Sequence, residues 1–228
     1  MLRAIVVSAA LGTLAMGLAG TFGSNVDPAH KFCWAENVGW LNWRRDVPGT
    51  GDGVVVTATY LEGPVWAENV GWINVGNGPP AHGVHYANDP ADSSTFGVNV
   101  DRATGELFGR AWGENIGWIS FDTRATQGPH NQQGRLDICA NRLRGYAWGE
   151  NIGWINLDDT VHFMALGPDC HGGDVACDGV ITLADYSKFP AAITGPEGAA
   201  TCPLLDADGD ADVDLGDFAE VQIEFSGE

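Results

Sequence analysis

The chain has 228 residues, of which 30 are acidic and 11 are lysine or arginine, so its formal net charge at pH 7 is −19. The charge is uneven, because residues 169–228 contain 14 acidic side chains and a single lysine. Such a field repels nucleic acid and anionic lipid and attracts divalent cations. The composition therefore excludes nucleic-acid binding, and the length suits one moderate domain plus one small domain.

The chain begins with Met1-Leu2-Arg3, an apolar run over residues 4–18 and the small residues Ala19 and Gly20. These features are typical of a secretory signal peptide, which we predict over residues 1–20. The alternative is a retained N-terminal anchor, although the run is shorter than the roughly 20 apolar residues of a membrane span. We expect the mature chain to be secreted or held at the cell surface, with no membrane span.

One motif, Trp-x-Glu-Asn-x-Gly-Trp, recurs four times in the larger part of the chain, and eight of the nine tryptophans occupy its two Trp positions. The copies span residues 34–40, 66–72, 112–118 and 148–154. Their flanks alternate apolar and polar residues, which predicts strands with one buried face. We therefore predict an all-β domain over residues 28–166, built from four units of about three strands each.

The arrangement of the four units is left open by the sequence. Repeats of this length cannot bury a face alone, so they stack or close into a ring. The first copy lacks the strand that precedes the other three, while an extra strand is predicted over residues 160–164, after the fourth copy. That late strand would complete the first unit and close a propeller-like ring. A stacked antiparallel meander is the alternative.

The Glu-Asn-x-Gly segment predicts a hairpin turn, with its two tryptophans paired across the strands. One interpretation is glycan binding by exposed indoles; the other is that tryptophan fills the core, since a residue present in every copy usually serves the architecture. A third is a ring of four carboxylates at one end of a closed barrel. The candidate ligand-binding residues are Trp34, Trp66, Trp112, Trp148, Glu36, Glu68, Glu114 and Glu150. These strings resemble repeats of uncharacterised secreted bacterial proteins, which implies no activity.

The five cysteines are Cys33, Cys139, Cys170, Cys177 and Cys202. Their spacing does not match a zinc pattern, and in an oxidising compartment their odd number leaves one unpaired. We predict a disulfide within the C-terminal three, with Cys170–Cys202 favoured, and Cys33–Cys139 as a second candidate pair.

An acidic twelve-residue loop lies near the C-terminus. It places carboxylates at positions one, three, five, nine and twelve and a backbone carbonyl at seven, which together can surround one Ca²⁺ with oxygen. Apolar residues at helical spacing follow it and predict an amphipathic helix. The predicted ligands are Asp206, Asp208, Asp210, Asp212, Asp214 and Asp217. Ala211 replaces the usual turn glycine, and its left-handed conformation costs about 1 kcal/mol. A solvated acidic tail is the alternative.

An earlier loop over residues 174–185 follows the same pattern with one gap. Ala176 empties position three, so we expect a weaker site. Its predicted ligands are Asp174, Asp178, Val180, Thr182 and Asp185.

The paired loops, each followed by a predicted helix, make residues 169–227 resemble the type I dockerin family, in a variant common in secreted planctomycete proteins. The resemblance implies calcium-dependent folding and docking onto a cohesin-type module, in systems that assemble polysaccharide-degrading enzymes. It also implies partner contacts by Leu183, Ala184, Leu215 and Gly216. Pro190 interrupts the first helix and departs from the family pattern.

No catalytic motif is present. The six histidines lack metal-ligand spacing, and four equivalent copies of glutamate single out no pair for glycoside hydrolysis. We therefore predict a non-catalytic scaffold or recognition protein tethered through a dockerin-like module. The alternative is a carbohydrate-binding or carbohydrate-processing component of a polysaccharide-degrading assembly.

Overall fold

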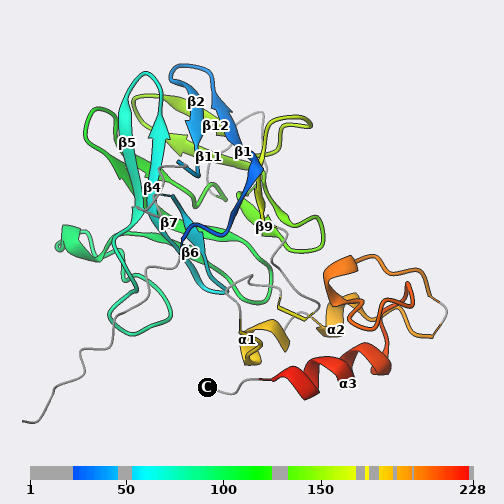
Figure 1. Cartoon of the computed structure of the whole chain (residues 1–228). Helices are drawn as coiled ribbons and strands as arrows, with labels where there is room; N and C mark the ends of the chain where they lie inside the picture. The colour runs from blue at the N-terminus through cyan, green and yellow to red at the C-terminus, as the bar shows by residue number, and fades with distance from the viewer. Residues whose placement is uncertain are drawn as a thin grey trace, which may run out of the picture.

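The computed structural model describes residues 23–45, 53–124, 133–167, 173–174, 180–186, 189–196 and 198–225. The predicted signal peptide, Cys170, Cys177 and Asp178 lie outside these ranges. Figure 1 shows a β-barrel and a smaller C-terminal unit with short helices. Among the described residues, no helix has both the length and the apolar character needed to cross a membrane.

The barrel closes on itself. Its eight antiparallel strands run in the order β1, β2, β4, β5, β7, β8, β11, β12, and β12 pairs back with β1. Their bounds are Val26–Ala35, Gly39–Asn42, Tyr60–Ala67, Gly71–Gly76, Leu107–Gly113, Gly117–Ser120, Tyr146–Gly149 and Gly153–Asn156. The prediction of an all-β repeat domain is confirmed, but the units form one continuous barrel, so both the propeller-like ring of separate blades and the open stack are wrong.

Each repeat forms one hairpin of the barrel. The two tryptophans of a copy are directly opposite one another in every hairpin, for example Trp34 and Trp40 on β1 and β2. Neighbouring hairpins join in one register, with an Asn or Ser opposite the next tryptophan, as Asn42 is opposite Trp66. The predicted turn and cross-strand pair are thus confirmed in all four copies.

Short strands extend each unit below its hairpin. β3 (Val55–Val56) pairs with β4, β6 (Val98–Val100) with β7, β9 (Arg135–Asp137) with β10 (Arg142–Arg144), and β13 (Met164–Leu166) with β1. A late strand therefore completes the first unit, as predicted, but it spans Met164–Leu166 and not residues 160–164. Glycines with φ between 78° and 102° stand where the long strands leave the hairpins, at Gly63, Gly109 and Gly145.

The barrel interior is filled by small and aliphatic side chains. On β1, Cys33 and Ala35 are buried while Trp34 between them is exposed, and an alanine is likewise buried next to the first tryptophan of every copy. None of the eight repeat tryptophans is buried, so the interpretation that they fill the core is wrong. An eight-stranded barrel is only wide enough inside for modest side chains, and indoles fit on its outer face. The ninth tryptophan, Trp43, is buried.

The cysteine pairing differs from both predicted pairs. Cys139 forms a disulfide with Cys202, and Cys33 is a buried free thiol on the inner face of β1. Burial raises the pKa of Cys33 to about 12. The predictions of Cys170–Cys202 and Cys33–Cys139 are therefore wrong. The physical reason is topological, because closure of the barrel points Cys33 inward and leaves Cys139 on an outer turn.

The C-terminal unit contains α1 (Leu183–Tyr186), α2 (Phe189–Ala192), the short 3-10 helix η2 (Pro203–Leu205) and α3 (Leu215–Glu224). The other short 3-10 helix, η1 (Ser93–Thr95), belongs to the barrel domain. Among the helices of the described ranges, α3 alone is longer than about one turn, and Asp214 caps it through a capping box with Asp217. The unit has a small core of its own, formed by Ile181, Phe189, Ala192, Cys202, Leu205, Val213 and Val221.

Glu62 on β4 gives a test of stability against pH. Its Oε2 atom is buried and has no hydrogen-bond partner among the described residues, and burial raises its pKa. A raised pKa in the folded state means that folding favours the protonated form of Glu62. Protonated Glu62 therefore contributes its full stability below pH 4.5, the ordinary pKa of a glutamate, and this contribution is lost as the pH rises through the folded-state pKa. We expect Glu62→Gln to raise the melting temperature at pH 7 and to leave it unchanged at pH 4. Equal shifts at the two pH values in thermal unfolding would contradict this.

Candidate functional site

The four hairpin turns are fastened to one another at one end of the barrel. Each turn asparagine donates from Nδ2 to a backbone carbonyl of the preceding turn in the ring, at 2.9–3.1 Å. The donor–acceptor pairs are Asn37 to Ile152, Asn69 to Val38, Asn115 to Val70 and Asn151 to Ile116. These bonds cross between neighbouring repeats and close a complete circle. Asparagine thus has an architectural role.

The four motif glutamates lie on these turns and are all exposed. Among the described residues, only two groups of three acidic side chains bring their oxygens within 4.8 Å of one another, and both belong to residues 206–217. Glu36, Glu68, Glu114 and Glu150 therefore surround the end of the barrel without gathering around one point.

The repeat tryptophans form edge-to-face pairs on the outside of the barrel. Their ring centroids are 4.6–4.9 Å apart and their planes are inclined by 62–71°. This is the favoured geometry of an aromatic pair. Trp34, Trp72 and Trp112 are 40%, 39% and 37% exposed. The predicted ligand residues Trp66 and Trp148 are half-buried, and in the second copy Trp72 is more exposed than Trp66. The alternation of apolar and polar residues could not show which tryptophan of a pair is the more exposed.

Arginine side chains lie against two of the tryptophan pairs. The Arg45 guanidinium lies 5.6 Å and 5.2 Å from the ring centres of Trp66 and Trp72, and Arg110 lies 4.9 Å from that of Trp118. Such cation–π contacts hold the rings in place. The barrel surface therefore presents firmly held indoles, which are suited to stacking on flat apolar ligand faces.

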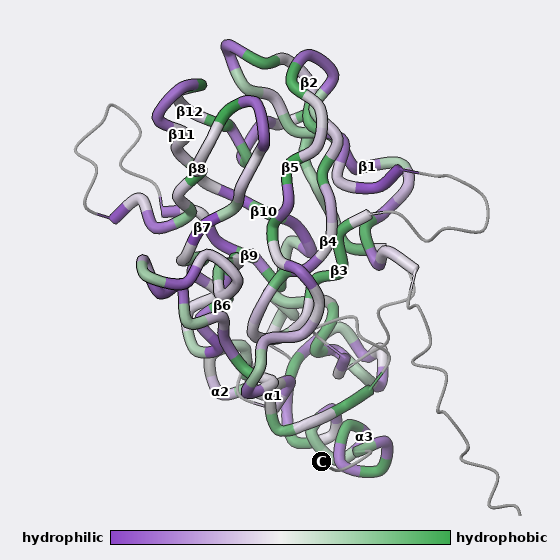
Figure 2. Tube along the Cα trace, turned by 90° about the vertical axis from the view of Figure 1, so that its left-hand side faces the viewer, coloured by the Kyte–Doolittle hydropathy of each residue, from purple (hydrophilic) through white to green (hydrophobic). Residues whose placement is uncertain are grey.

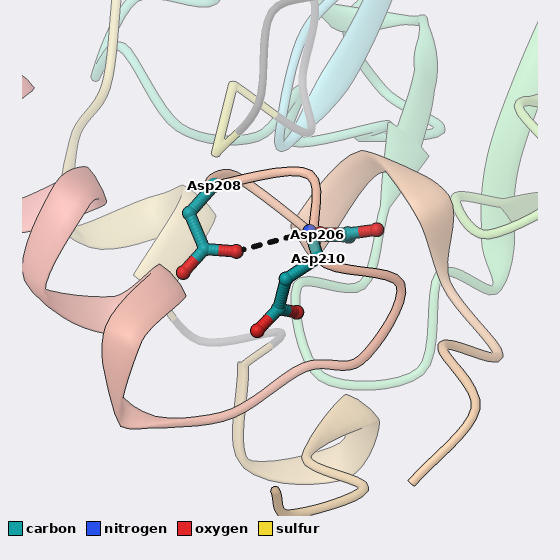
Figure 3. A group of neighbouring side chains, drawn as sticks. All are labelled: Asp206, Asp208 and Asp210. Carbon is teal, nitrogen blue, oxygen red and sulfur yellow. Dashed lines mark hydrogen bonds between the residues drawn. The ribbon is translucent and has the colours of Figure 1, made fainter. Parts of the chain in front are cut away.

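The acidic loop before α3 brings three carboxylates together, as Figure 3 shows. Oxygens of Asp206, Asp208 and Asp210 lie within 4.8 Å of one another. Asp206 Oδ2 accepts a hydrogen bond from the Ala211 amide at 3.1 Å, and Asp208 Oδ1 accepts one from the Asp210 amide at 3.2 Å. The pKa of Asp208 is raised, first by desolvation and then by the neighbouring carboxylates. Ala211 has a φ of 75°, which is the left-handed conformation expected from the sequence.

Asp217 ties the two ends of this loop together. Its carboxylate is buried and accepts hydrogen bonds from the amides of Ala207, Asp208 and Asp214, at 2.7, 3.2 and 2.7 Å. Asp212, Asp214 and Asp217 form the second group with oxygens within 4.8 Å. All six predicted ligands of this loop are thus brought into two adjoining groups.

The earlier loop is described only at its ends. Asp174 and Asp185 are buried, and Asp185 Oδ2 accepts from the amide and the hydroxyl of Thr182 at 2.9 and 3.2 Å. Asp178 lies outside the described residues, so the geometry of this second predicted site stays a prediction. Val180 is exposed.

Of the predicted partner contacts, Leu183 and Leu215 are 58% and 76% exposed. Gly216 is also exposed, and the side chain of Ala184 lies outside the described set. Two leucines at the same loop position therefore face solvent on the small unit.

The candidate sites are thus the acidic loop before α3 and the tryptophan pairs on the barrel wall. Comparison of the chain with protein-family models, with curated proteins and with solved structures finds no match.

Proposed function

We propose that this is a secreted, non-catalytic scaffold or recognition protein whose loop over residues 206–217 binds Ca²⁺ and supports a docking module. The observation that carries the proposal is that carboxylate oxygens of Asp206, Asp208 and Asp210 lie within 4.8 Å of one another. Like charges gathered at this distance repel one another unless a cation lies between them.

The donor set fits calcium. Ca²⁺ takes six to eight oxygen ligands from carboxylates, carbonyls and water, and this loop offers only oxygen. Asp206 Oδ1 is buried and has no hydrogen-bond partner among the described residues. A buried polar atom without a partner is destabilising, and a bound cation would satisfy it. The side chains of Asp206, Asp208, Asp210, Asp214 and Asp217 and the carbonyl of Asp212 would hold the ion.

Calcium would supply positive charge that neutralises the loop and fixes the entry to α3. The weaker site would be formed by Asp174, Asp178, Val180, Thr182 and Asp185. With the loops ordered, the exposed Leu183 and Leu215, together with Ala184 and Gly216, would form the face for a cohesin-type protein module. Leu215→Asp is the corresponding test, since a charge in that face should abolish capture of such a module.

Calcium-titration calorimetry on the full chain tests the proposal. We expect saturable binding that is weakened at least about tenfold by Asp206→Asn with Asp210→Asn, because these remove two ligand charges. Glu220→Gln with Glu224→Gln is the matched control, since it removes the same charge from α3 outside the loop.

The control variant should bind calcium as the unaltered chain does. An absence of saturable heat in the unaltered chain would refute the site. Equal weakening in both variants would show that the ion responds only to diffuse negative charge.

A second candidate function is carbohydrate recognition, favoured by the exposure of Trp34, Trp72 and Trp112. Indole faces stack on the apolar faces of sugars, and the wall of the barrel repeats this surface around its circumference. Trp112→Ala should weaken retention on an insoluble polysaccharide, whereas Val161→Ala, at another exposed apolar position, should not. Retention on no member of a polysaccharide panel would refute this function, and turnover of a glycan would establish a carbohydrate-processing enzyme instead.

A further inference from the structure

The C-terminal unit is covalently fastened to the barrel. Cys139 lies in the turn between β9 and β10, and Cys202 stands immediately before η2, so the disulfide joins positions 63 residues apart. Figures 1 and 2 both place the C-terminal unit at the end of the barrel opposite β2. The small unit is therefore not a module on a free linker.

Packing reinforces the same junction. Ile138, next to Cys139, contacts the core of the barrel and the core of the C-terminal unit. A cavity of about 260 Å³ lies between the two units, and its lining includes Leu136 and Ile138 from the barrel and Ala192 and Leu205 from the small unit. The disulfide forms part of the cavity wall.

The fastened segment leads directly to both acidic loops. Cys202 is buried, η2 follows it, and Asp206, position one of the second loop, comes directly after η2. The Leu204 carbonyl in η2 accepts a hydrogen bond from the Gly173 amide at 2.9 Å. Gly173 precedes Asp174, position one of the earlier loop. The disulfide therefore holds the segment from which the first ligand of each loop is positioned.

We infer that the Cys139–Cys202 disulfide and calcium binding at residues 206–217 are thermodynamically coupled, so that the oxidised chain binds Ca²⁺ more tightly than the reduced chain. This inference rests on the calcium site proposed above. Ordering a loop around an ion costs conformational entropy, which opposes binding. A segment that is already fixed loses less entropy, so binding to it is tighter. By linkage, calcium stabilises the disulfide against reduction by the same factor.

Reduction proceeds by exchange with a dithiol. Cys139 is exposed whereas Cys202 is buried, so the reductant thiolate attacks the Cys139 sulfur. A new sulfur–sulfur bond joins Cys139 to the reductant, the bond to Cys202 breaks, and Cys202 leaves as a thiolate that takes up a proton. The second reductant thiolate then displaces Cys139, which is protonated in turn. Two electrons pass to the protein, and the reductant becomes a cyclic disulfide.

The test measures the redox equilibrium of this disulfide in buffers of reduced and oxidised dithiothreitol, with the Cys139–Cys202 peptide quantified after alkylation. In the full chain, saturating calcium should shift the equilibrium toward the disulfide by at least about fivefold, a typical lower bound for coupled sites. The Asp206→Asn, Asp210→Asn chain should show no calcium-dependent shift. In calorimetry, Cys139→Ser with Cys202→Ser should bind calcium more weakly by the same factor.

An equilibrium unmoved by calcium, in a chain that binds calcium calorimetrically, would overturn the coupling and leave the calcium site intact. An absence of calcium binding by the oxidised chain would overturn both proposals. If the double-serine variant does not fold, the redox equilibrium of the unaltered chain decides the question, because that measurement needs no cysteine substitution.

Discussion

Gly145→Ala is expected to destabilise the chain by about 3 kcal/mol or more, among the largest effects of a single methyl group. Gly145 has a φ of 78°, and a Cβ added there would lie 2.2 Å from the Gln133 carbonyl oxygen. The left-handed conformation alone costs an alanine about 1–2 kcal/mol. The clash adds to this because its partner is backbone, which cannot rotate away as a side chain would.

Gly78→Ala separates the two contributions. Gly78 has a φ of 73° but nothing within 4 Å of an added Cβ, so this substitution should cost only about 1 kcal/mol. Denaturant unfolding of both variants measures the difference. Equal costs would mean that the strand can shift away from the carbonyl and that the bend at Gly145 is not fixed by close approach.

Leu107→Ala should destabilise the chain by about 3 kcal/mol, within the usual range for a buried leucine. Leu61, Leu107 and Leu143 are all completely buried and stand five residues before the first tryptophan of their copies. Because the repeats occupy equivalent places in one ring, the three substitutions to alanine should have nearly the same cost.

Val161→Ala is the control, since Val161 is largely exposed and its truncation should change the free energy of unfolding by less than about 0.5 kcal/mol. The three leucine variants and this control are compared by denaturant unfolding. Costs that differ by more than about 2 kcal/mol among the leucines would show that the pseudo-symmetry of the backbone does not extend to the packing.

Much of the barrel follows from its sequence. The paired tryptophans predict the hairpins because a turn of Glu-Asn-x-Gly leaves them directly opposite one another. The strand missing before the first copy and the surplus strand after the fourth predict that the end of the repeat domain completes the first unit. These features are local or countable, and β13 does pair with β1, although the barrel itself is closed by the pairing of β12 with β1.

Other features depend on closure itself. The alternation of apolar and polar residues shows that a strand has two faces but not which face lies inside the barrel. The feature that indicated outward tryptophans was the small residue next to the first tryptophan of each copy, such as Ala35 or Ala111. The link from Asn115 to the Val70 carbonyl joins residues in different repeats. The Cys139–Cys202 bond likewise depends on which turn faces the small unit, and no sequence spacing encodes that.

The pairing of β1 with β12 and β13 has a consequence for biosynthesis. β1 finds two of its neighbours only when residues 153–166 have been made, so the barrel cannot be completed while the chain is still growing through its third repeat. Until then the first and the latest hairpins each leave an open edge, and open edges invite pairing with other chains. A nascent chain therefore has to be kept apart from its copies until the fourth repeat emerges.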